Sequence, residues 1–336
     1  MRRSFHIIVV FALVGLMVLT VARAQQSRQR IATPTAKPSP IPSPSPSPQS
    51  GINVDDVIRV SSNLIVVPVS VTDGKDQPVE GLRLQEFRLE EEGQPQEIVQ
   101  FGDSEQVPLE MAILLDVSGS VKGRFGFEKE AAARFIKSIL KPADKAVLYA
   151  IDMTPRLVQT RANAEQVAAK LESIQDSESP TAFYDTVVDA ANYLVKFTPP
   201  QHRRVILVIS DGEDTFSENI RNVSATLSAV LRADAILYSI NPSGPTIQLD
   251  ALSTHGQSEL QTLASATGGA AFVPSAPENL DHIFHKIAVE LRSQYLLEYY
   301  GKSSLPNGTF LHIKVKVPGR PELRIRARQG YYMAQN

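Results

Sequence analysis

The chain of 336 residues contains no cysteine, and its formal net charge is only -2. Without cysteine there can be no disulfide, no thiolate nucleophile, no cysteine-ligated zinc and no lipidated N-terminal cysteine. The small net charge gives no electrostatic reason to expect nucleic acid as a partner, and we predict none. The rest of the composition, 43% hydrophobic and 21% charged, is typical of globular proteins. The length suits one large domain and a smaller one.

A signal peptide for export is predicted over residues 1–24. Arg2 and Arg3 form a short basic region, residues 7–21 are apolar and uncharged, and Ala-Arg-Ala at 22–24 offers small residues for cleavage. An uncleaved anchor is the alternative, but about 15 apolar residues are fewer than the ~20 that span a bilayer. We expect a periplasmic, secreted or cell-surface protein with no stable membrane span after cleavage.

A disordered linker is predicted over residues 25–52. It consists mainly of Pro, Ser, Ala, Thr and Gln, with a Pro-Ser alternation over 38–48. Such a segment cannot bury enough apolar area to offset the entropy lost on ordering. We expect an extended, semi-rigid spacer, although a recognition role for its prolines is the alternative.

Hydrophobic alternation with a period of two predicts β strands at both ends of the remaining chain. It occurs at 65–71 in an N-terminal β unit, residues 53–105, and again in residues 293–334. A few strands alone are marginally stable. We therefore predict that the C-terminal strands pack with the N-terminal β unit, as one β domain interrupted by residues 106–292.

In residues 106–292, short continuous apolar runs alternate with helical stretches. Continuous hydrophobicity is typical of strands that are covered on both faces. The predicted fold class is therefore α/β, with a doubly wound, mostly parallel sheet. The predicted strands are 111–115, 146–151, 205–209, 235–240 and 270–273, and the predicted helices are 127–140, 164–174, 183–197, 218–232, 259–266 and 278–291.

Oxygen-bearing side chains follow two of these strands. Asp116 ends an apolar run, with Ser118 and Ser120 two and four residues later, and Asp211 directly follows another run. Thr181 stands where a helix is expected to begin. Because the carboxyl ends of parallel strands meet at one sheet edge, these groups are expected to converge. Carboxylates and hydroxyls favour Mg²⁺, Mn²⁺ or Ca²⁺ over zinc.

Three stretches in this order resemble the von Willebrand factor A family. They are Asp-x-Ser-x-Ser at 116–120, Thr-Ala-Phe-Tyr-Asp at 181–185 and Ile-Ser-Asp-Gly-Glu-Asp at 209–214, within a resemblance covering about 110–292. Pro180 departs from the glycine often found before the threonine, which could stiffen that loop. The resemblance implies a non-enzymatic adhesion module with a metal-ion-dependent adhesion site made of Asp116, Ser118, Ser120, Thr181 and Asp211.

The flanking segments resemble a narrower family of exported von Willebrand A-related proteins that is abundant in Acidobacteria. This resemblance rests on 67–101, the strand at 295–300 and the closing Arg-Gln-Gly-Tyr-Tyr at 328–332. It implies no particular ligand.

Two functions from different classes are compatible with these features. In the first, a protein ligand offers an Asp or Glu carboxylate to the cation, as in adhesion or another envelope protein–protein interaction. In the second, the chain is a structural subunit of an envelope assembly, and the metal only stabilises the domain. Chelation distinguishes them, because only the first loses its partner reversibly.

Simpler explanations exist for each member of the predicted site. Asp116 and Asp211 could merely cap turns, and Thr181 could be a plain N-cap. Asp214 and Glu213 are interpreted as solvated acids in the first turn of a helix rather than as ligands.

Enzymatic chemistry has little support in the sequence. A catalytic serine would need a Gly-x-Ser-x-Gly turn, which is missing, and neither His202 nor His255 stands in a motif that marks a general base. A phosphotransfer aspartate at 116 would need a second aspartate where Ser118 stands. We predict that the protein is not an enzyme.

Two features outside the motif have a structural and a functional interpretation. His282 and His285 could share a helix face, but without a third ligand surface exposure is favoured over zinc binding. If the strands at 313–317 and 323–328 pair, they would present a basic face to an anionic envelope polymer. The favoured interpretation is a solvated basic face whose charges are balanced by the acidic residues at 90–92. The basic residues concerned are Lys314, Lys316, Arg324, Arg326 and Arg328.

Overall fold

The computed structural model describes two regions, an α/β domain and a β domain, over residues 63–119, 123, 125–244, 251–276, 279–301 and 305–333. The predicted signal peptide and linker lie outside these residues, as does Ser120. Among the helices that are described, none is both long and apolar enough to cross a membrane.

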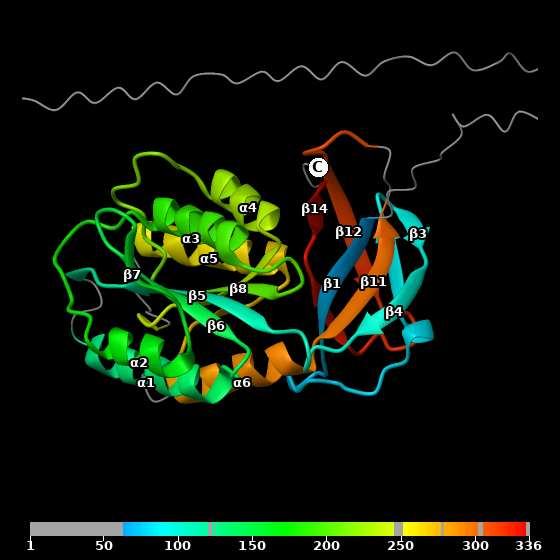
Figure 1. Cartoon of the computed structure of the whole chain (residues 1–336), viewed down its shortest axis with the longest axis horizontal. Helices are drawn as coiled ribbons and strands as arrows, with labels where there is room; N and C mark the ends of the chain where they lie inside the picture. Colours follow the sequence, from blue (N-terminus) through cyan, green and yellow to red (C-terminus); the bar gives the residue numbers. More distant parts are fainter. Residues whose placement is uncertain are drawn as a thin grey trace, which may run out of the picture. The chain divides into compact units, whose positions relative to one another are not determined.

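The α/β domain contains a six-stranded sheet in which only the edge strand β7 runs antiparallel to its neighbour (Figure 1). This confirms the predicted fold class. In spatial order the strands are β10 (Ala271–Phe272), β9 (Ala235–Ile240), β8 (Arg203–Ile209), β5 (Leu109–Asp116), β6 (Lys145–Ile151) and β7 (Arg156–Ala162).

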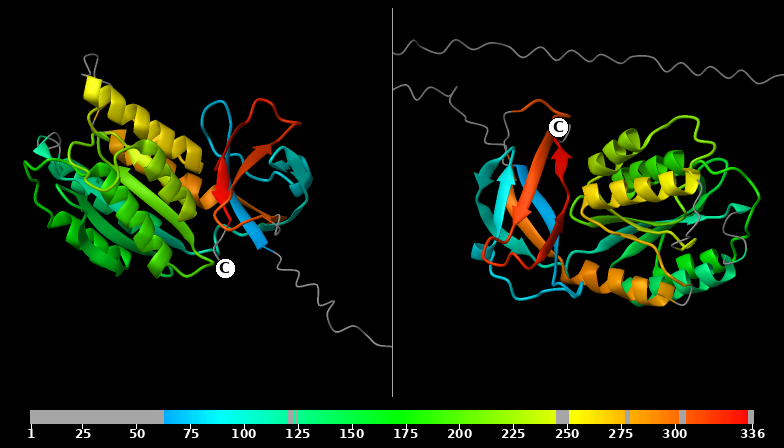
Figure 2. Two further views of the ribbon diagram at one scale, coloured as in Figure 1. Left: turned by 90° about the horizontal axis from the view of Figure 1, so that it is seen from above. Right: turned by 180° about the vertical axis from the view of Figure 1, so that it is seen from behind.

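Helices cover both faces of this sheet, and the central strand β5 is buried along its whole length. One face packs against α1 (Phe125–Ile139), α2 (Ala164–Glu172) and α6 (Leu280–Ser293). The other packs against α3 (Phe183–Phe197), α4 (Val223–Arg232) and α5 (Ala251–Thr267). Figure 2 (right) shows yellow α5 and orange α6 on opposite faces.

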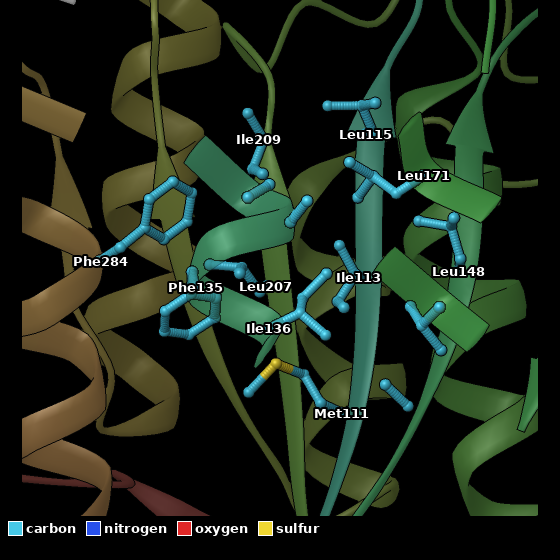
Figure 3. Packing of buried hydrophobic residues seen from close by; sticks show 14 of the residues in the cluster. Met111, Ile113, Leu115, Phe135, Ile136, Leu148, Leu171, Leu207, Ile209 and Phe284 are labelled. Carbon is cyan, nitrogen blue, oxygen red and sulfur yellow. The ribbon is translucent and has the colours of Figure 1, made fainter. Parts of the chain in front are cut away.

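Alternation along β5 sends its side chains into two separate cores. Met111, Ile113 and Leu115 point toward α1 and α6, where Ile136 and Phe284 meet them (Figure 3). Ala112 and Leu114 face α3 and join the opposite cluster. Double coverage explains why the strand is a continuous apolar run rather than an alternating one.

The β domain consists of two four-stranded sheets that enclose one hydrophobic core. The first has the order β13 (Arg324–Ala327), β1 (Asn63–Thr72), β11 (Tyr295–Gly301) and β4 (Ile98–Gly102). The second has the order β14 (Gly330–Tyr332), β12 (Phe310–Lys316), β2 (Arg88–Glu91) and β3 (Gln94–Gln96). Each sheet therefore combines strands from before the α/β domain with strands from after it.

The α/β domain is inserted between β4 and β11, which are neighbours in one sheet. Gly102 at the end of β4 lies opposite Leu296 at the start of β11. A Cβ atom at Gly102 would stand 2.8 Å from Glu298 Oε1, the end of a flexible side chain, and 3.2 Å from Leu296 Cβ, so a larger residue would require these neighbours to shift. The two ends of the insertion consequently leave the β domain side by side.

Several elements differ from the sequence-based expectation, and α5 begins at Ala251 rather than at 259. Strand β7 was not anticipated, and neither was β14. Helix α4 begins at Val223 rather than at 218. The reason is that the Asp185 carboxylate accepts hydrogen bonds from the N–H groups of residues 218–220 at 2.8–3.2 Å, which holds this stretch in a loop.

The premise of a basic sheet face is wrong. Strands β12 and β13 belong to different sheets and are not hydrogen-bonded to each other. Lys316 instead pairs with Glu90, Arg324 with Asp76, and Arg326 and Arg328 are ion-paired toward the α/β domain. Glu90 does form an ion pair with a lysine, as the interpretation of a solvated face proposed.

A buried polar network joins the two domains at the end of α6. Glu290 Oε1 accepts hydrogen bonds from Ser70 Oγ of β1 at 2.9 Å and from the Tyr238 hydroxyl of β9 at 2.7 Å. Its other oxygen pairs with Arg326 of β13. Gln294 Nε2 adds a 3.2 Å bond to Ser70 Oγ. A single carboxylate that is 5% exposed thus connects α6 with β9 of the α/β sheet and with β1 and β13 of one β-domain sheet.

Removing this carboxylate should destabilise the protein severely. We expect Glu290→Ala to lower the free energy of unfolding by about 3–5 kcal/mol, because Arg326 and two buried hydroxyls lose their partner. Asp281→Ala on the same helix is the control: its pair with Arg134 is about half exposed, and we expect less than about 1 kcal/mol. Urea unfolding of both variants measures the difference. Equal losses would contradict the assigned role of Glu290.

Candidate metal centre

Three of the predicted site residues lie at the carboxyl edge of the α/β sheet. Asp116 is the last residue of β5, Asp211 follows the neighbouring strand β8 by two residues, and Thr181 precedes α3. Their exposed fractions are 0%, 5% and 6%, respectively. Charged and hydroxyl groups are seldom buried so completely at a strand edge without partners.

The Asp116 carboxylate is held by hydrogen bonds to both of its oxygens. Oδ1 accepts from the Ser118 N–H at 2.9 Å, and Oδ2 accepts from Ser210 Oγ at 2.6 Å. Burial nevertheless raises the pKa of Asp116 to about 6, and the negative charge of Asp211 contributes to the rise. The structure therefore brings the two carboxylates within electrostatic reach of each other.

The loop that carries Asp211 is packed tightly against α5. Gly212 adopts a left-handed φ of +81°, and a Cβ atom there would lie 2.7 Å from the Gly256 carbonyl oxygen. Gly256 is equally constrained, because its Cβ would lie 2.8 Å from the Asp211 carbonyl oxygen. The Asp211 carboxylate also accepts the Glu213 N–H at 3.1 Å. This pair of glycines sets the position of Asp211 relative to the sheet.

Thr181 is fixed through its backbone, which leaves its hydroxyl out of the hydrogen bonding among the described residues. Its N–H donates to Thr215 Oγ1 at 2.8 Å, and its carbonyl oxygen accepts from Thr215 N and Phe216 N. The N-cap residue of α3 is Ala182, and no side chain caps it there. The interpretation of Thr181 as a plain N-cap is therefore wrong.

Two acids near Thr181 stabilise loops. Asp214 accepts the Tyr184 N–H of α3 at 3.2 Å and a bond from Ser217 Oγ, so it is not the solvated first-turn acid that was expected. Asp185 accepts four hydrogen bonds from residues 218–220, which lower its pKa against the opposing effect of burial. These contacts hold the 211–220 loop beside Thr181.

One contributor to the site was not identified from the sequence. Ser210 joins the two strands, because its Oγ donates to Asp116 and accepts the Gly212 N–H at 3.0 Å. Its position directly before Asp211 was the available signal. Ser118 is 7% exposed, and its hydroxyl also hydrogen-bonds Asp116. Ser120 lies outside the described residues, so its role stays a prediction.

The donor set fits a hard divalent cation. It consists of two carboxylates and uncharged hydroxyls, which Mg²⁺, Mn²⁺ and Ca²⁺ prefer. It includes no nitrogen or sulfur donor. Within the described part of the chain no group of three or more His, Cys, Asp or Glu residues is placed to hold a metal, and His282 and His285 are exposed on α6.

The comparison with known protein families agrees with this geometry. Residues 111–213 match the von Willebrand factor type A domain, and the matched segment contains every residue of the predicted site. The α/β domain of this chain is a von Willebrand factor type A domain. No curated protein matches the chain significantly.

Several solved structures resemble the chain at low sequence identity. One is the PilB minor pilin from Streptococcus sanguinis, with 14% identity, a TM-score of 0.43, and coverage of 56% of this chain and 62% of that one. Another is proximal thread matrix protein 1 from the mussel byssus with a zinc-occupied metal site, at 14% identity, TM-score 0.48, and coverage of 61% and 50%. A von Willebrand factor type A protein from Catenulispora acidiphila has 15% identity, TM-score 0.45, and coverage of 70% and 51%. This chain thus spans less than two thirds of each of these structures.

The buried charge of Asp116 should cost the metal-free protein stability in a pH-dependent way. Since the folded-state pKa of about 6 exceeds the ordinary value of 3.8, the folded state binds more protons between these pH values. Stability should therefore fall as the pH rises from 4 to 7. At pH 7 in EDTA, Asp116→Asn should be more stable than the parent by up to about 3 kcal/mol, and at pH 4 by little. Urea unfolding at both pH values measures this. An Asn variant that is less stable at pH 7 would refute it.

Proposed function

We propose that this chain is an exported, non-enzymatic protein that captures a protein ligand through a divalent cation. The cation would be Mg²⁺, Mn²⁺ or Ca²⁺, held by Asp116, Ser118, Ser120, Thr181 and Asp211. The observation that carries the proposal is the buried pair of carboxylates, Asp116 and Asp211, at the carboxyl edge of the sheet. Two like charges are stabilised together there once a dication lies between them.

The charge balance of the site favours an acidic ligand. Two carboxylates neutralise a dication, whereas hydroxyls add no charge. A bound cation would supply an electrophilic coordination position, which a carboxylate from a partner Asp or Glu can fill. This chain's own residues would orient the cation: Ser210 and the Ser118 N–H fix Asp116, and the Gly212–Gly256 contact fixes Asp211.

Exposed apolar side chains lie on the loops around the site and support a protein ligand. Met153 follows Asp152, whose carbonyl oxygen accepts the Ala182 N–H beside Thr181. Phe216 donates its N–H to the Thr181 carbonyl oxygen. Met153 and Phe216 are 45% and 40% exposed. Apolar groups around a polar centre are typical of surfaces that bind proteins.

The two histidines considered as general bases, His202 and His255, both contact carboxylates. His202 Nδ1 contacts Glu110 at 2.9 Å near the start of β5, at the opposite edge of the sheet. His255 Nε2 contacts Glu259 on its own helix at 3.1 Å. The hydroxyl of Ser210 already donates to Asp116.

The first described residue and the proposed site lie at the ends of different strands, in different domains. Asn63 pairs with Gly301, the end of β11 that is farthest along the strand from α6. The strands of the α/β domain start near the β domain and carry Asp116 and Asp211 at their other ends.

A structural subunit remains the second candidate because of the buried network at Glu290. This network fixes α6 to strands β1 and β13, so the two domains behave as one unit that could be part of an assembly. In that case, the cation would only stabilise the loops around Asp116.

Loss of the Thr181 hydroxyl should weaken metal binding without unfolding the protein. We expect Thr181→Val to reduce Mg²⁺ affinity at least about tenfold, since the loss of a group that merely orients a ligand often costs that much. The melting temperature in EDTA should change little, because the backbone bonds of Thr181 remain. Calorimetric titration with Mg²⁺ measures the affinity, and Thr160→Val on β7 serves as the control. Unchanged affinity would remove Thr181 from the site.

Partner capture should depend reversibly on the cation. We expect protein retained from cell-envelope extract in Mg²⁺ to be released by EDTA, and to be missing with Asp116→Ala. Asp152→Ala, which removes an acid that holds the neighbouring turn, is the control. It should retain more of the partner than Asp116→Ala does. Quantitative mass spectrometry of the eluates measures each arm.

Retention of the partner in EDTA together with a lower melting temperature would instead support the structural subunit. Replacement of Phe216 by serine separates the contact surface from the cation. It should weaken capture while leaving Mg²⁺ affinity unchanged.

A further inference from the structure

A cavity of about 390 Å³ lies between α5 and the edge of the sheet formed by β9 and β10. None of the predicted metal ligands lines it. Its size falls within the range of pockets that bind small molecules. The described lining residues are Ser239, Asn241, Thr254, Gln257, Ser258, Leu260, Gln261, Ala271, Phe272 and Val273. We call it the α5 cavity.

The helical wall of the α5 cavity is a polar stripe. Thr254, Gln257, Ser258 and Gln261 follow the i, i+3, i+4, i+7 spacing that places side chains on one helix face. The side of α5 that packs on the sheet is apolar, at Leu260 and Leu263. Thr254, Ser258 and Gln261 are exposed, so the stripe forms the open side of the cavity, and Gln257 contributes a buried oxygen to its wall.

The strand wall contributes a buried hydroxyl at an unusual place. Ala235 and Leu237 of β9 pack into the apolar cluster beneath α5, and Ser239 is the next residue on that face. Ser239 is fully buried, and its Oγ has no hydrogen-bond partner among the described residues. The same holds for Gln257 Oε1 across the cavity. Buried polar atoms without partners destabilise a fold, so their retention points to a ligand.

The chemistry of the wall restricts what the ligand can be. The described lining holds hydroxyls and amides but no Lys, Arg, His, Asp or Glu. A phosphate or another ion would therefore lack a countercharge. Hydroxyl and amide groups on the ligand could satisfy both Ser239 Oγ and Gln257 Oε1, while Leu260 and Ala271 would contact its carbon skeleton.

We propose that the α5 cavity binds a small uncharged molecule that carries hydroxyl or amide groups, about the size of a monosaccharide. This site is independent of the proposed cation site. It uses other residues, and its ligand needs no negative charge.

Four probes test the proposal on the full chain: glycerol, D-glucose, N-acetyl-D-glucosamine and acetamide. Saturation-transfer NMR should show binding of at least one of them to the parent protein. In Ser239→Ala and in Gln257→Leu, the affinity for that probe should fall at least about tenfold, because each loses a polar contact in a buried site. Ser265→Ala, which alters an exposed hydroxyl bonded within α5, should bind as the parent does.

Thermal melting separates loss of the site from loss of the fold. Because each cavity variant removes a polar atom without a partner, its melting temperature without probe should equal or exceed that of the parent. The proposal is wrong if none of the four probes binds, or if both cavity variants bind as the parent does. It is also wrong if both variants melt below the Ser265→Ala control, because their polar atoms would then be satisfied inside the folded protein.

The Asp116→Asn variant distinguishes this site from the cation site. It should bind the probe with parental affinity in EDTA. In the parent protein, a failure of partner capture in Mg²⁺ with intact probe binding would overturn only the proposed function. Partner capture without probe binding would overturn only the α5 cavity.

Discussion

The pairing of β4 with β11 is the constraint on which both domains depend. These neighbouring strands are the points where the chain leaves and re-enters the β domain, with Gly102 opposite Leu296. Arg203 closes the junction, because its guanidinium donates to the carbonyl oxygens of Ser104 before the insertion and Leu291 at its end, both at 2.8 Å. Burial, together with the like charge of Arg292, lowers the pKa of Arg203 to about 10, so desolvation of this guanidinium is not fully offset.

The same constraint determines where the functional edge lies. All strands that begin at the junction carry their carboxyl ends away from it, and parallel strands collect their ligand-binding groups at that edge. Asp116 and Asp211 therefore occur on adjacent strands at the far side from Arg203. The polar network at Glu290 keeps α6 from changing this arrangement independently of the β domain. The orientation of the proposed cation site therefore follows from the point at which the α/β domain is inserted.

Local patterns predicted the parts whose causes are local. The apolar run that ends in Asp116 and the helix at 183–197 could be predicted directly. Burial on both faces and helical periodicity each produce a hydrophobic pattern among neighbouring residues. Contacts between residues far apart in the sequence produce no such local pattern. The start of α4 depends on Asp185, more than 30 residues away. The sheet to which Arg324 belongs depends on the pairing of β13 with β1. Ser210 was missed because its partner, Asp116, is 94 residues distant.

The two proposed sites use burial in opposite ways. Asp116 is a charge taken out of water, so its raised pKa expresses a free-energy deficit that a cation can remove. Ser239 is a neutral hydroxyl, for which the deficit is smaller and a water molecule or an uncharged ligand suffices. Helix α5 touches both, through Gly256 against the Asp211 loop and through Gln257 in the cavity.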